Sequence, residues 1–327
     1  MKILSIKGLS LSLALIAIAF ITPQVTKAAL TVGAVSITTD STLSLQGGDV
    51  GIGTLSPDQE LEVVGNIAIP TTVDATSGVI YKGADPFIHN FALAGSDGQN
   101  TYIGINAGNF TMTGSVGGQG SYNTGVGRYA GASNTTGSFN SSYGGFSLYS
   151  NGAGSYNNGY GHNSLLSNST GSYNIGVGYR SLFSNTTGSY NIAIGHQALF
   201  DQNILDSTGA NTAIGYNTGR GITTGINNTV IGANVTGLSA ALSNNIIIAD
   251  GAGNQRINVD SAGEVGLGTN DPTEKLDINS DAIRLRNTRT PALATETCVQ
   301  GEIGWDTSYI YVCVATDTWK RSAIATW

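Results

Sequence analysis

A repeat of 17 residues in the middle of the chain constrains its fold more than any other feature. Each frame opens Gly-Ser-aromatic-Asn and carries glycine at its eighth position. The five regular frames begin at Gly120, Gly137, Gly154, Gly171 and Gly188. Looser copies begin at Gly98, Gly209 and Gly225, where Asn100, Asn211 and Asn227 take the place of the frame asparagine. We therefore expect eight similar structural units in succession.

A repeat this short predicts a stack of β coils. Helical-hairpin repeats need about 33 residues or more, and the frames are rich in the β-branched and aromatic residues that favour strands. Coils of one frame each would stack at the strand spacing of about 4.8 Å, with glycines at the corners where the backbone needs a positive φ. The sequence thus predicts an all-β fold, a β-roll or β-solenoid over residues 98–240.

The asparagine at the fourth position of each frame predicts an internal ladder. Stacked amides bond the copies above and below them, and this satisfies buried polar groups that are otherwise costly to desolvate. The predicted ladder residues are Asn123, Asn140, Asn157, Asn174 and Asn191.

A second duplication lies on both sides of the repeats. Val50-Gly51-Ile52-Gly53-Thr54 is matched by Val265-Gly266-Leu267-Gly268-Thr269, and the residues Pro57, Leu61 and Val63 recur as Pro272, Leu276 and Ile278. We expect two matching β collars, at residues 29–66 and 241–280. Residues 67–97 would then be a connector between the first collar and the repeats.

The N-terminal residues resemble an export signal. Lys2 and Lys7 precede an apolar stretch from Leu9 to Ile21, and small residues follow near Ala28. We expect residues 1–28 to be removed and the protein to be secreted or displayed on a cell surface, with a retained N-terminal anchor as the alternative. No second apolar run of about 20 residues follows.

The end of the chain, residues 281–327, is expected to form a small β meander. Its two cysteines, Cys298 and Cys313, predict a disulfide within the chain, because paired cysteines in an exported protein are usually oxidised. Two buried thiols or a bridge between chains remain alternatives. The candidate binding surface of this tip consists of Trp305, Tyr309, Tyr311 and Trp319. The interpretation that we favour is that the tip rings cover an open sheet edge.

The composition argues against several functional classes. Charged residues make up 11% of the chain, and the net charge of −7 with no basic cluster argues against nucleic acid as a partner. The Gly-x-Gly sequences belong to the repeat, and neither a phosphate loop nor a nucleophile elbow occurs. We expect no cofactor, no catalytic residues and no enzyme.

Metal binding is also not expected. His162 and His196 occupy the ninth frame position, but Arg128, Gly145 and Tyr179 share it, so we interpret that position as an exposed variable site. The five regular frames contain Asp201 as their single acid, whereas calcium-binding β-rolls place aspartate in each repeat.

An aromatic residue occupies the third position of each regular frame. The five are Tyr122, Phe139, Tyr156, Tyr173 and Tyr190. Such a column can stack on sugar rings, but its recurrence favours packing inside the coils. Asn134, Asn168 and Asn185 have the form of glycosylation sites, although their place at the frame junctions favours a role as turn residues.

Two resemblances follow from these motifs. The frames Gly171-Ser172-Tyr173-Asn174-Ile175-Gly176-Val177-Gly178 and Asn211-Thr212-Ala213-Ile214-Gly215 resemble head repeats of trimeric autotransporter adhesins, which implies a left-handed trimeric β-roll. The Gly-Ile-Gly-Thr motif is similar to collars of tail-fibre-like proteins that carry an endosialidase-type chaperone. Residues 281–327 contain neither the adhesins' membrane anchor nor a chaperone of that size, so we infer no self-cleavage.

The sequence as a whole therefore predicts a fibrous structural or adhesin protein that mediates attachment. The resemblance implies a homotrimer, with a cell-surface glycan or protein as the receptor and membrane contact only through an unidentified anchor. The alternatives are a monomeric β-solenoid that binds carbohydrate and a phage-derived receptor-binding tail fibre.

Overall fold

The computed structural model describes residues 50–52, 58–92, 94–112, 117–204, 208–284 and 286–325. The chain divides into two compact units, Met1–Pro70 and Thr71–Trp327. Every regular element in the described residues is a strand, which confirms the all-β prediction. Accordingly, this part of the chain contains no helix able to cross a membrane. The expected export signal lies outside the described residues.

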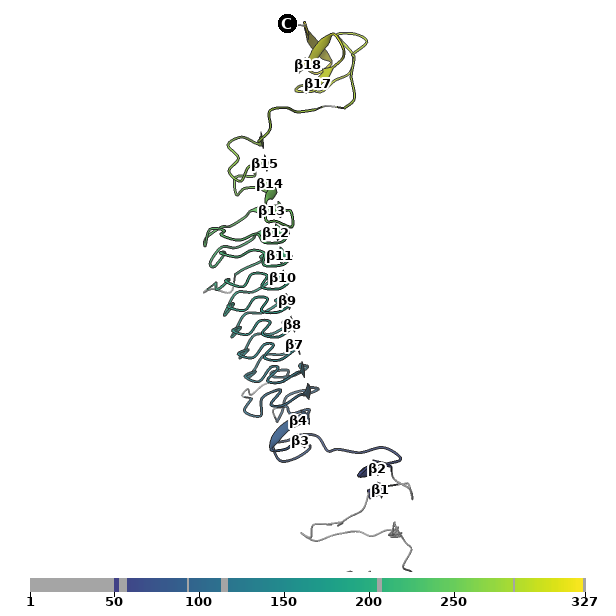
Figure 1. Cartoon of the computed structure of the whole chain (residues 1–327), viewed down its shortest axis with the longest axis vertical. Coiled ribbons are helices and arrows are strands. Elements are labelled where there is room, and N and C mark those ends of the chain that lie inside the picture. Colours follow the sequence, from purple (N-terminus) through teal and green to yellow (C-terminus); the bar gives the residue numbers. More distant parts are fainter. Residues whose placement is uncertain are drawn as a thin grey trace, which may run out of the picture. The chain divides into compact units, whose positions relative to one another are not determined.

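The repeats form one parallel ladder of short strands, as Figure 1 shows. The strands are β5 (Thr101–Ile103), β6 (Thr124–Val126), β7 (Ser141–Tyr143), β8 (Asn158–Tyr160), β9 (Ile175–Val177), β10 (Ile192–Ile194), β11 (Thr212–Ile214), β12 (Thr229–Ile231) and β13 (Ile246–Ala249). Each strand pairs in parallel with the next. Each predicted frame supplies one strand, which confirms the solenoid. The ladder continues through β13, beyond the expected boundary at residue 240.

Leucine and a small strand residue together fill the interior of most regular coils. Leu148, Leu165 and Leu182 are buried, and they belong to the main apolar core. A Cβ added to Gly176, the middle residue of β9, would lie 2.6 Å from Ser164 Oγ and 3.3 Å from Leu165 Cγ. Because the serine and the leucine occupy that space, the middle strand residue must stay small. In β12 and β13 the middle residues are the larger Val230 and Ile247, and Leu238 and Leu242 pack against the same core.

The first regular frame has glycine in place of this leucine, and the ring of Tyr102 occupies the space. A Cβ on Gly125 would lie 2.7 Å from Tyr102 Cδ1, and one on Gly131 would lie 3.7 Å from Tyr102 Cε1. Tyr102 is buried, and this burial raises the pKa of its hydroxyl. The irregular frame is therefore filled by a side chain from the preceding coil.

The corner glycine at the eighth frame position is required by both its conformation and its surroundings. Gly161 has a φ of 136°, and a Cβ built on it would lie 2.6 Å from the carbonyl oxygen of Gly178 in the next coil. Such a contact is shorter than any real Cβ makes, and backbone in the neighbouring coil cannot swing aside. The coils can stack this closely only because no side chain stands at the corner.

Antiparallel strands flank the ladder in the 14-stranded sheet. Residues 67–97, expected as a connector, contain the hairpin of β3 (Ile80–Lys82) and β4 (Asp85–His89), and β4 pairs with β5. At the other end, β14 (Gln255–Val259) pairs antiparallel with both β13 and β15 (Val265–Leu267). The last strand of the sheet is β16 (Leu276–Ile278).

The two collar motifs fold in the same way. In the N-terminal copy, β1 (Val50–Ile52) pairs in parallel with β2 (Leu61–Val63), just as β15 pairs with β16. The capping bonds match as well: the Asp58 backbone N–H donates to the Glu62 carboxylate at 2.9 Å, and that of Thr273 donates to the Asp277 carboxylate at 3.1 Å. Residues 29–49 and 53–57 of the first expected collar lie outside the described residues.

The C-terminal tip is a separate three-stranded sheet. It consists of β17 (Ile303–Trp305), β18 (Tyr309–Ala315) and β19 (Thr318–Ala323), which pair antiparallel in sequence order. This is the small β meander that the sequence predicts.

Replacing a corner glycine tests the stacking argument. We expect Gly161→Ala to reduce the free energy of unfolding by about 1–3 kcal/mol, because the new methyl group meets backbone of the next coil. The matched control is Gly152→Ser, since the equivalent positions already carry Thr135, Ser169 and Thr186. Denaturant unfolding followed by circular dichroism measures both, and equal stability of the two variants would contradict the argument.

Candidate functional site

The five predicted ladder asparagines are buried and bond the neighbouring coils. Asn157 shows the pattern: its Oδ1 accepts from the backbone N–H of Asn174 at 3.0 Å, and its Nδ2 donates to the carbonyl oxygen of Gly171 at 2.8 Å. Most of the bonds therefore run from a side-chain amide to backbone of the next coil. These residues support the fold and leave no amide exposed for a ligand.

This ladder extends beyond the regular frames, with one correction. It begins at Asn100, whose Oδ1 accepts from the Asn123 backbone N–H at 2.8 Å. After Asn211 it passes through Asn228, since the Asn228 backbone N–H donates to Asn211 Oδ1 at 2.9 Å. The assignment of Asn227 to the ladder was wrong: Asn227 is exposed, and the inward position falls one residue later.

A second amide ladder was missed in the sequence analysis. It consists of Asn134, Asn151, Asn168 and Asn185, the fifteenth residues of four successive frames. Asn168 Nδ2 donates to Asn151 Oδ1 at 2.7 Å, and Asn185 Nδ2 donates to Asn168 Oδ1 at 3.0 Å. The fixed fifteenth position was the signal for this ladder. Asn134, Asn168 and Asn185, three asparagines with the form of glycosylation sites, belong to it and are buried, so the folded chain does not present them to solvent.

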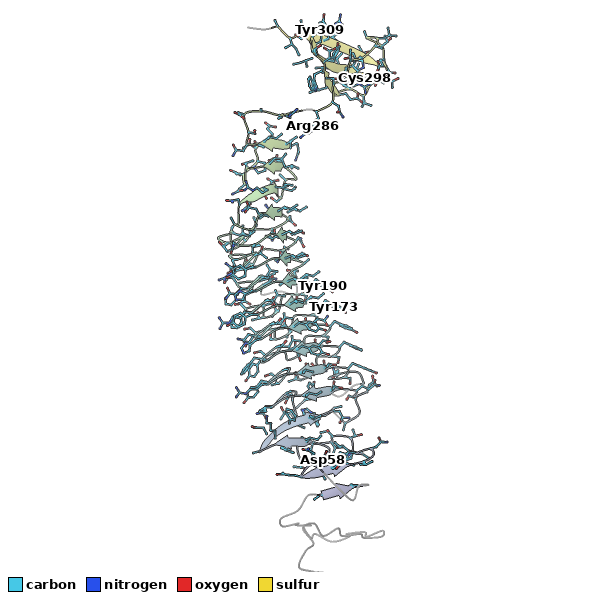
Figure 2. All side chains as sticks on the ribbon, turned by 45° about the vertical axis from the view of Figure 1, so that its right-hand side comes forward. Asp58, Tyr173, Tyr190, Arg286, Cys298 and Tyr309 are labelled. Atoms are coloured by element: carbon cyan, nitrogen blue, oxygen red, sulfur yellow. A yellow bond between two sulfur atoms is a disulfide. The ribbon has the colours of Figure 1, made fainter. Side chains whose placement is uncertain are left out.

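The aromatic column does not pack inside the coils, which corrects the interpretation that we favoured. Four of its five rings are more than one third exposed, and Tyr190 is the most exposed at 59%. Adjacent rings lie 4.8–5.1 Å apart and within 6° of parallel. Figure 2 shows Tyr173 and Tyr190 next to each other on the same edge of the stack. The rings turn outward because the serine before and the asparagine after each of them point inward.

Histidine and tyrosine alternate in another stack at the ninth frame position. His162, Tyr179, His196 and Tyr216 have consecutive ring centroids 5.1–5.9 Å apart. The two histidines are thus separated by a tyrosine ring and do not face each other. Nowhere in the described ranges do three His, Cys, Asp or Glu side chains gather as a metal site would require.

The outer face of the parallel ladder carries an apolar stripe. The third residue of most strands is apolar and between 36% and 42% exposed. The stripe consists of Ile103, Tyr143, Tyr160, Val177, Ile194, Ile214, Ile231 and Ile248. Strand register places successive members side by side, as in the pairs Ile194↔Ile214 and Ile214↔Ile231. An exposed apolar surface of this continuity is typical of a protein interface.

The tip residues divide between core and surface. Tyr311 and Trp319 are buried in a cluster with both cysteines, so their assignment to a binding surface is corrected. They point inward because alternate residues of β18 and β19 face that core. Trp305 and Tyr309 are half-buried. Trp305 lines a cleft of about 330 Å³ together with Ile283, Arg284, Ile303, Gly304 and Ile310.

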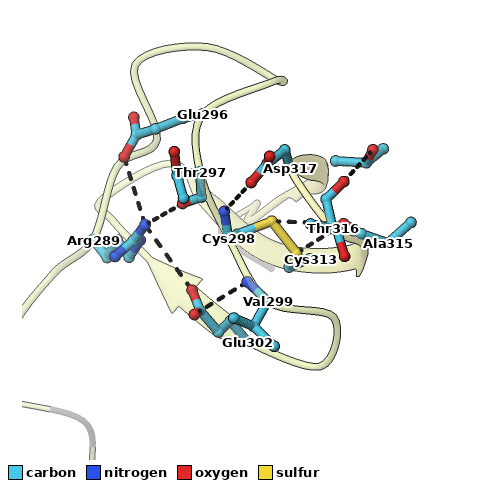
Figure 3. Close-up of a disulfide and its surroundings, with 11 residues drawn as sticks. Arg289, Glu296, Thr297, Cys298, Val299, Glu302, Cys313, Ala315, Thr316 and Asp317 are labelled. Atoms are coloured by element: carbon cyan, nitrogen blue, oxygen red, sulfur yellow. Dashed lines mark hydrogen bonds and ion pairs between the residues drawn. A yellow bond between two sulfur atoms is a disulfide. The ribbon is translucent and has the colours of Figure 1, made fainter.

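A disulfide joins Cys298 to Cys313, as expected, and Figure 3 shows its surroundings. Arg289 Nη2 lies 3.5 Å from the Glu296 carboxylate and donates to the Thr297 carbonyl oxygen at 3.1 Å. The same guanidinium lies 5.1 Å from the centroid of the Trp319 ring. These contacts attach the loop before Cys298 to the sheet.

A carboxylate organises the turn between β17 and β18. Asp306 Oδ2 accepts from the Tyr311 hydroxyl at 2.6 Å, and Oδ1 accepts from the backbone N–H groups of Ser308 and Tyr309. These bonds, that from Tyr311 above all, lower the pKa of Asp306 to about 2. The carboxylate is therefore a structural acceptor with its bonding capacity in use.

Comparison with known proteins found a local similarity. A stretch of the chain is 39% identical over 57 residues to the capsule K30/K69-specific depolymerase of Klebsiella phage K64-1. The match covers 17% of this chain and 7% of the phage protein. No family model matches the chain, and no solved structure matches it.

The depolymerase match corrects one expectation from the sequence. We expected that the chain is not an enzyme, because its acids and bases are sparse and known catalytic motifs are missing. Since a segment of the chain is similar to a depolymerase, that exclusion was wrong. Scarcity of charge along a repeat does not exclude enzymes whose catalytic groups come from few positions.

Removing the disulfide tests its role in the tip. The bridge closes a loop with a sequence separation of 15 residues. We expect Cys298→Ala with Cys313→Ala to destabilise the tip by about 3 kcal/mol, because the unfolded loop gains conformational freedom. Amide hydrogen exchange of β17–β19 measures the change, with exchange in β6–β10 as the internal control. Unchanged protection of the tip strands would contradict this role.

Proposed function

We propose that this chain is the receptor-binding part of a tail-spike-like or surface fibre, and that it attaches to cell-surface polysaccharide. The observation that carries the proposal is the exposed aromatic column on a rigid solenoid. Aromatic rings offer apolar area and a polar edge at little conformational cost, which suits recognition of sugars. The match to a phage capsule depolymerase supports the same class of target. An extracellular or virion-associated location accords with this proposal.

The fibre is proposed to be a homotrimer in which the apolar stripe forms the contact between copies. Support comes from the resemblance of the frames to adhesin head repeats and from the stripe along β5–β13. Copies of one chain carry the same spacing from strand to strand, so their stripes can meet in register. This contact would cover the exposed isoleucine and tyrosine side chains.

A second candidate function is cleavage of the polysaccharide that the fibre binds. The depolymerase match favours it specifically. The shared segment covers a small part of both chains. We therefore test binding of the polysaccharide and its cleavage separately.

Retention on capsular polysaccharide distinguishes these functions. We expect the full chain to be retained by immobilised Klebsiella K30 or K69 capsular polysaccharide and not by a dextran matrix. Release of reducing ends from the soluble polysaccharide then reports cleavage. Binding without new reducing ends supports the fibre alone, and binding with them supports the depolymerase. No retention on either capsule type would overturn K30/K69 capsule as the receptor and withdraw the support that the match gives.

The mass in solution tests the trimer. Light scattering of the full-length chain should give about three times its mass of 33.5 kDa, with or without reductant. Ile214→Glu with Ile231→Glu should yield monomers, because the carboxylates would be buried without partners. Tyr216→Glu, at an exposed position outside the stripe, is the control. A monomeric wild-type chain would exclude the proposed assembly.

A further inference from the structure

The third frame position forms a continuous row of outward side chains along the solenoid. All its members have φ between 51° and 62°, so the backbone presents each of them in the same way. The row consists of Gln99, Tyr122, Phe139, Tyr156, Tyr173, Tyr190, Ala210, Asn227 and Asn244. Rings occupy it from Tyr122 to Tyr190, and amides occupy its last two positions. Ala210 lies between the two groups and has neither.

Among the described residues, no ring covers the second face of Tyr190. Its other face stacks on Tyr173, with the ring centroids 5.1 Å apart and the planes within 3°. Register places Ala210 beside Tyr190, because the Ala210 backbone N–H donates to the carbonyl oxygen of Ser189 at 3.1 Å. A methyl group cannot cover an aromatic ring. This accounts for the exposure of Tyr190, the highest in the column at 59%.

Asn227 bounds the far side of this gap. The backbone N–H of Asn227 donates to the carbonyl oxygen of Gly209 at 2.9 Å, which places it one coil beyond Ala210. Its Nδ2 donates to Asn244 Oδ1 at 3.0 Å, away from Ala210. The amide oxygen is then the group left to accept a hydrogen bond on the side of the gap. An aromatic face and a hydrogen-bond acceptor thus stand two coil spacings apart, roughly 9.6 Å.

We propose that this gap is a binding subsite for one pyranose ring of a glycan, an inference that rests on the proposed attachment to polysaccharide. The sugar would take the place of the missing aromatic ring. Its C–H face would lie on Tyr190, whose π face is negative and attracts polarised C–H groups, and a hydroxyl would donate to Asn227 Oδ1. The side chain of Ala210 is small enough to form the floor.

The chemistry of the gap favours a neutral sugar. None of the described side chains of this row is charged, so a carboxylate or a phosphate would find no counter-ion within the row. The column spacing of 4.8–5.1 Å suits a flat or chair-shaped ring stacked on one side. The neighbouring rings cannot serve equally, because each of Phe139, Tyr156 and Tyr173 has both faces covered by other rings.

Filling the gap is the sharpest test. Ala210→Tyr restores a ring at a position whose φ of 51° is close to that of Tyr190, so the fold should accept it. The new ring would stack on Tyr190 and occupy the subsite. Ala210→Ser is the matched control, because it changes the same residue and leaves the space open. Tyr190→Ala removes the platform, and Tyr190→Phe keeps it, as Phe139 does in the same column.

The probes are methyl glycosides of glucose, galactose and mannose, followed by saturation-transfer NMR on the full chain. We expect at least one to bind the wild-type protein, Ala210→Ser and Tyr190→Phe. Affinity should fall by about tenfold in Ala210→Tyr and Tyr190→Ala, since a stacking contact is lost. Thermal unfolding of Ala210→Tyr should occur at the wild-type temperature or above it, which separates occlusion from misfolding.

Two results would overturn the subsite: no binding of any glycoside to the wild-type chain, or undiminished binding to Ala210→Tyr. Retention of the same variants on K30 or K69 capsular polysaccharide separates this inference from the proposed function. If the wild type and Ala210→Tyr are retained equally, the fibre function stands and the subsite falls. If glycoside binding is lost in Ala210→Tyr but neither polysaccharide retains the wild type, the subsite stands and capsule attachment falls.

Discussion

The hydrogen bond from a buried asparagine to the backbone of the next coil is the interaction on which the rest of the solenoid depends. It joins equivalent residues of successive coils, so these residues must lie directly above one another along the solenoid axis. Two intervals depart from 17 residues. Asn100 and Asn123 are 23 apart and Asn191 and Asn211 are 20 apart, yet the backbone N–H of the later residue still donates to Oδ1 of the earlier one, at 2.8 Å and 3.0 Å. The extra residues leave the ladder unbroken. This register also fixes the positions of the core leucines, the corner glycines and the outward columns.

Polar burial and small cores go together in this molecule. A coil of 17 residues encloses room for one leucine or tyrosine, and little apolar area is gained by folding a single coil. Two columns of amides therefore share the interior with the apolar one. The first column bonds backbone of the neighbouring coil, and the second bonds the equivalent asparagine of the neighbouring coil and a glycine carbonyl of its own coil. This explains how a chain with few charges and many glycines forms a defined interior.

Periodicity in the sequence was sufficient to predict the strands, the first amide ladder and the matching collars, because each depends on spacing. Spacing alone could not predict whether a side chain points into the coil or out of it. A column of tyrosines at equal intervals stacks in either case, and only the alternation with its inward-facing serine and asparagine neighbours shows that the rings point outward. Asn227 and Asn228 are adjacent, so their assignment required the side-chain geometry. In the tip, Tyr311 and Cys313 are two residues apart in one strand and therefore lie on the same face. This spacing indicated that Tyr311 is buried beside the disulfide, and the sequence analysis did not take it into account.

The uniform backbone of the outward row has an evolutionary consequence. Glutamine, tyrosine, phenylalanine, alanine and asparagine all occupy it with nearly the same φ, and none of them contributes to the interior. Replacement at one member leaves the register of the others unchanged. Evolution can therefore exchange one outward side chain at a time while the coils that carry the row stay as they are.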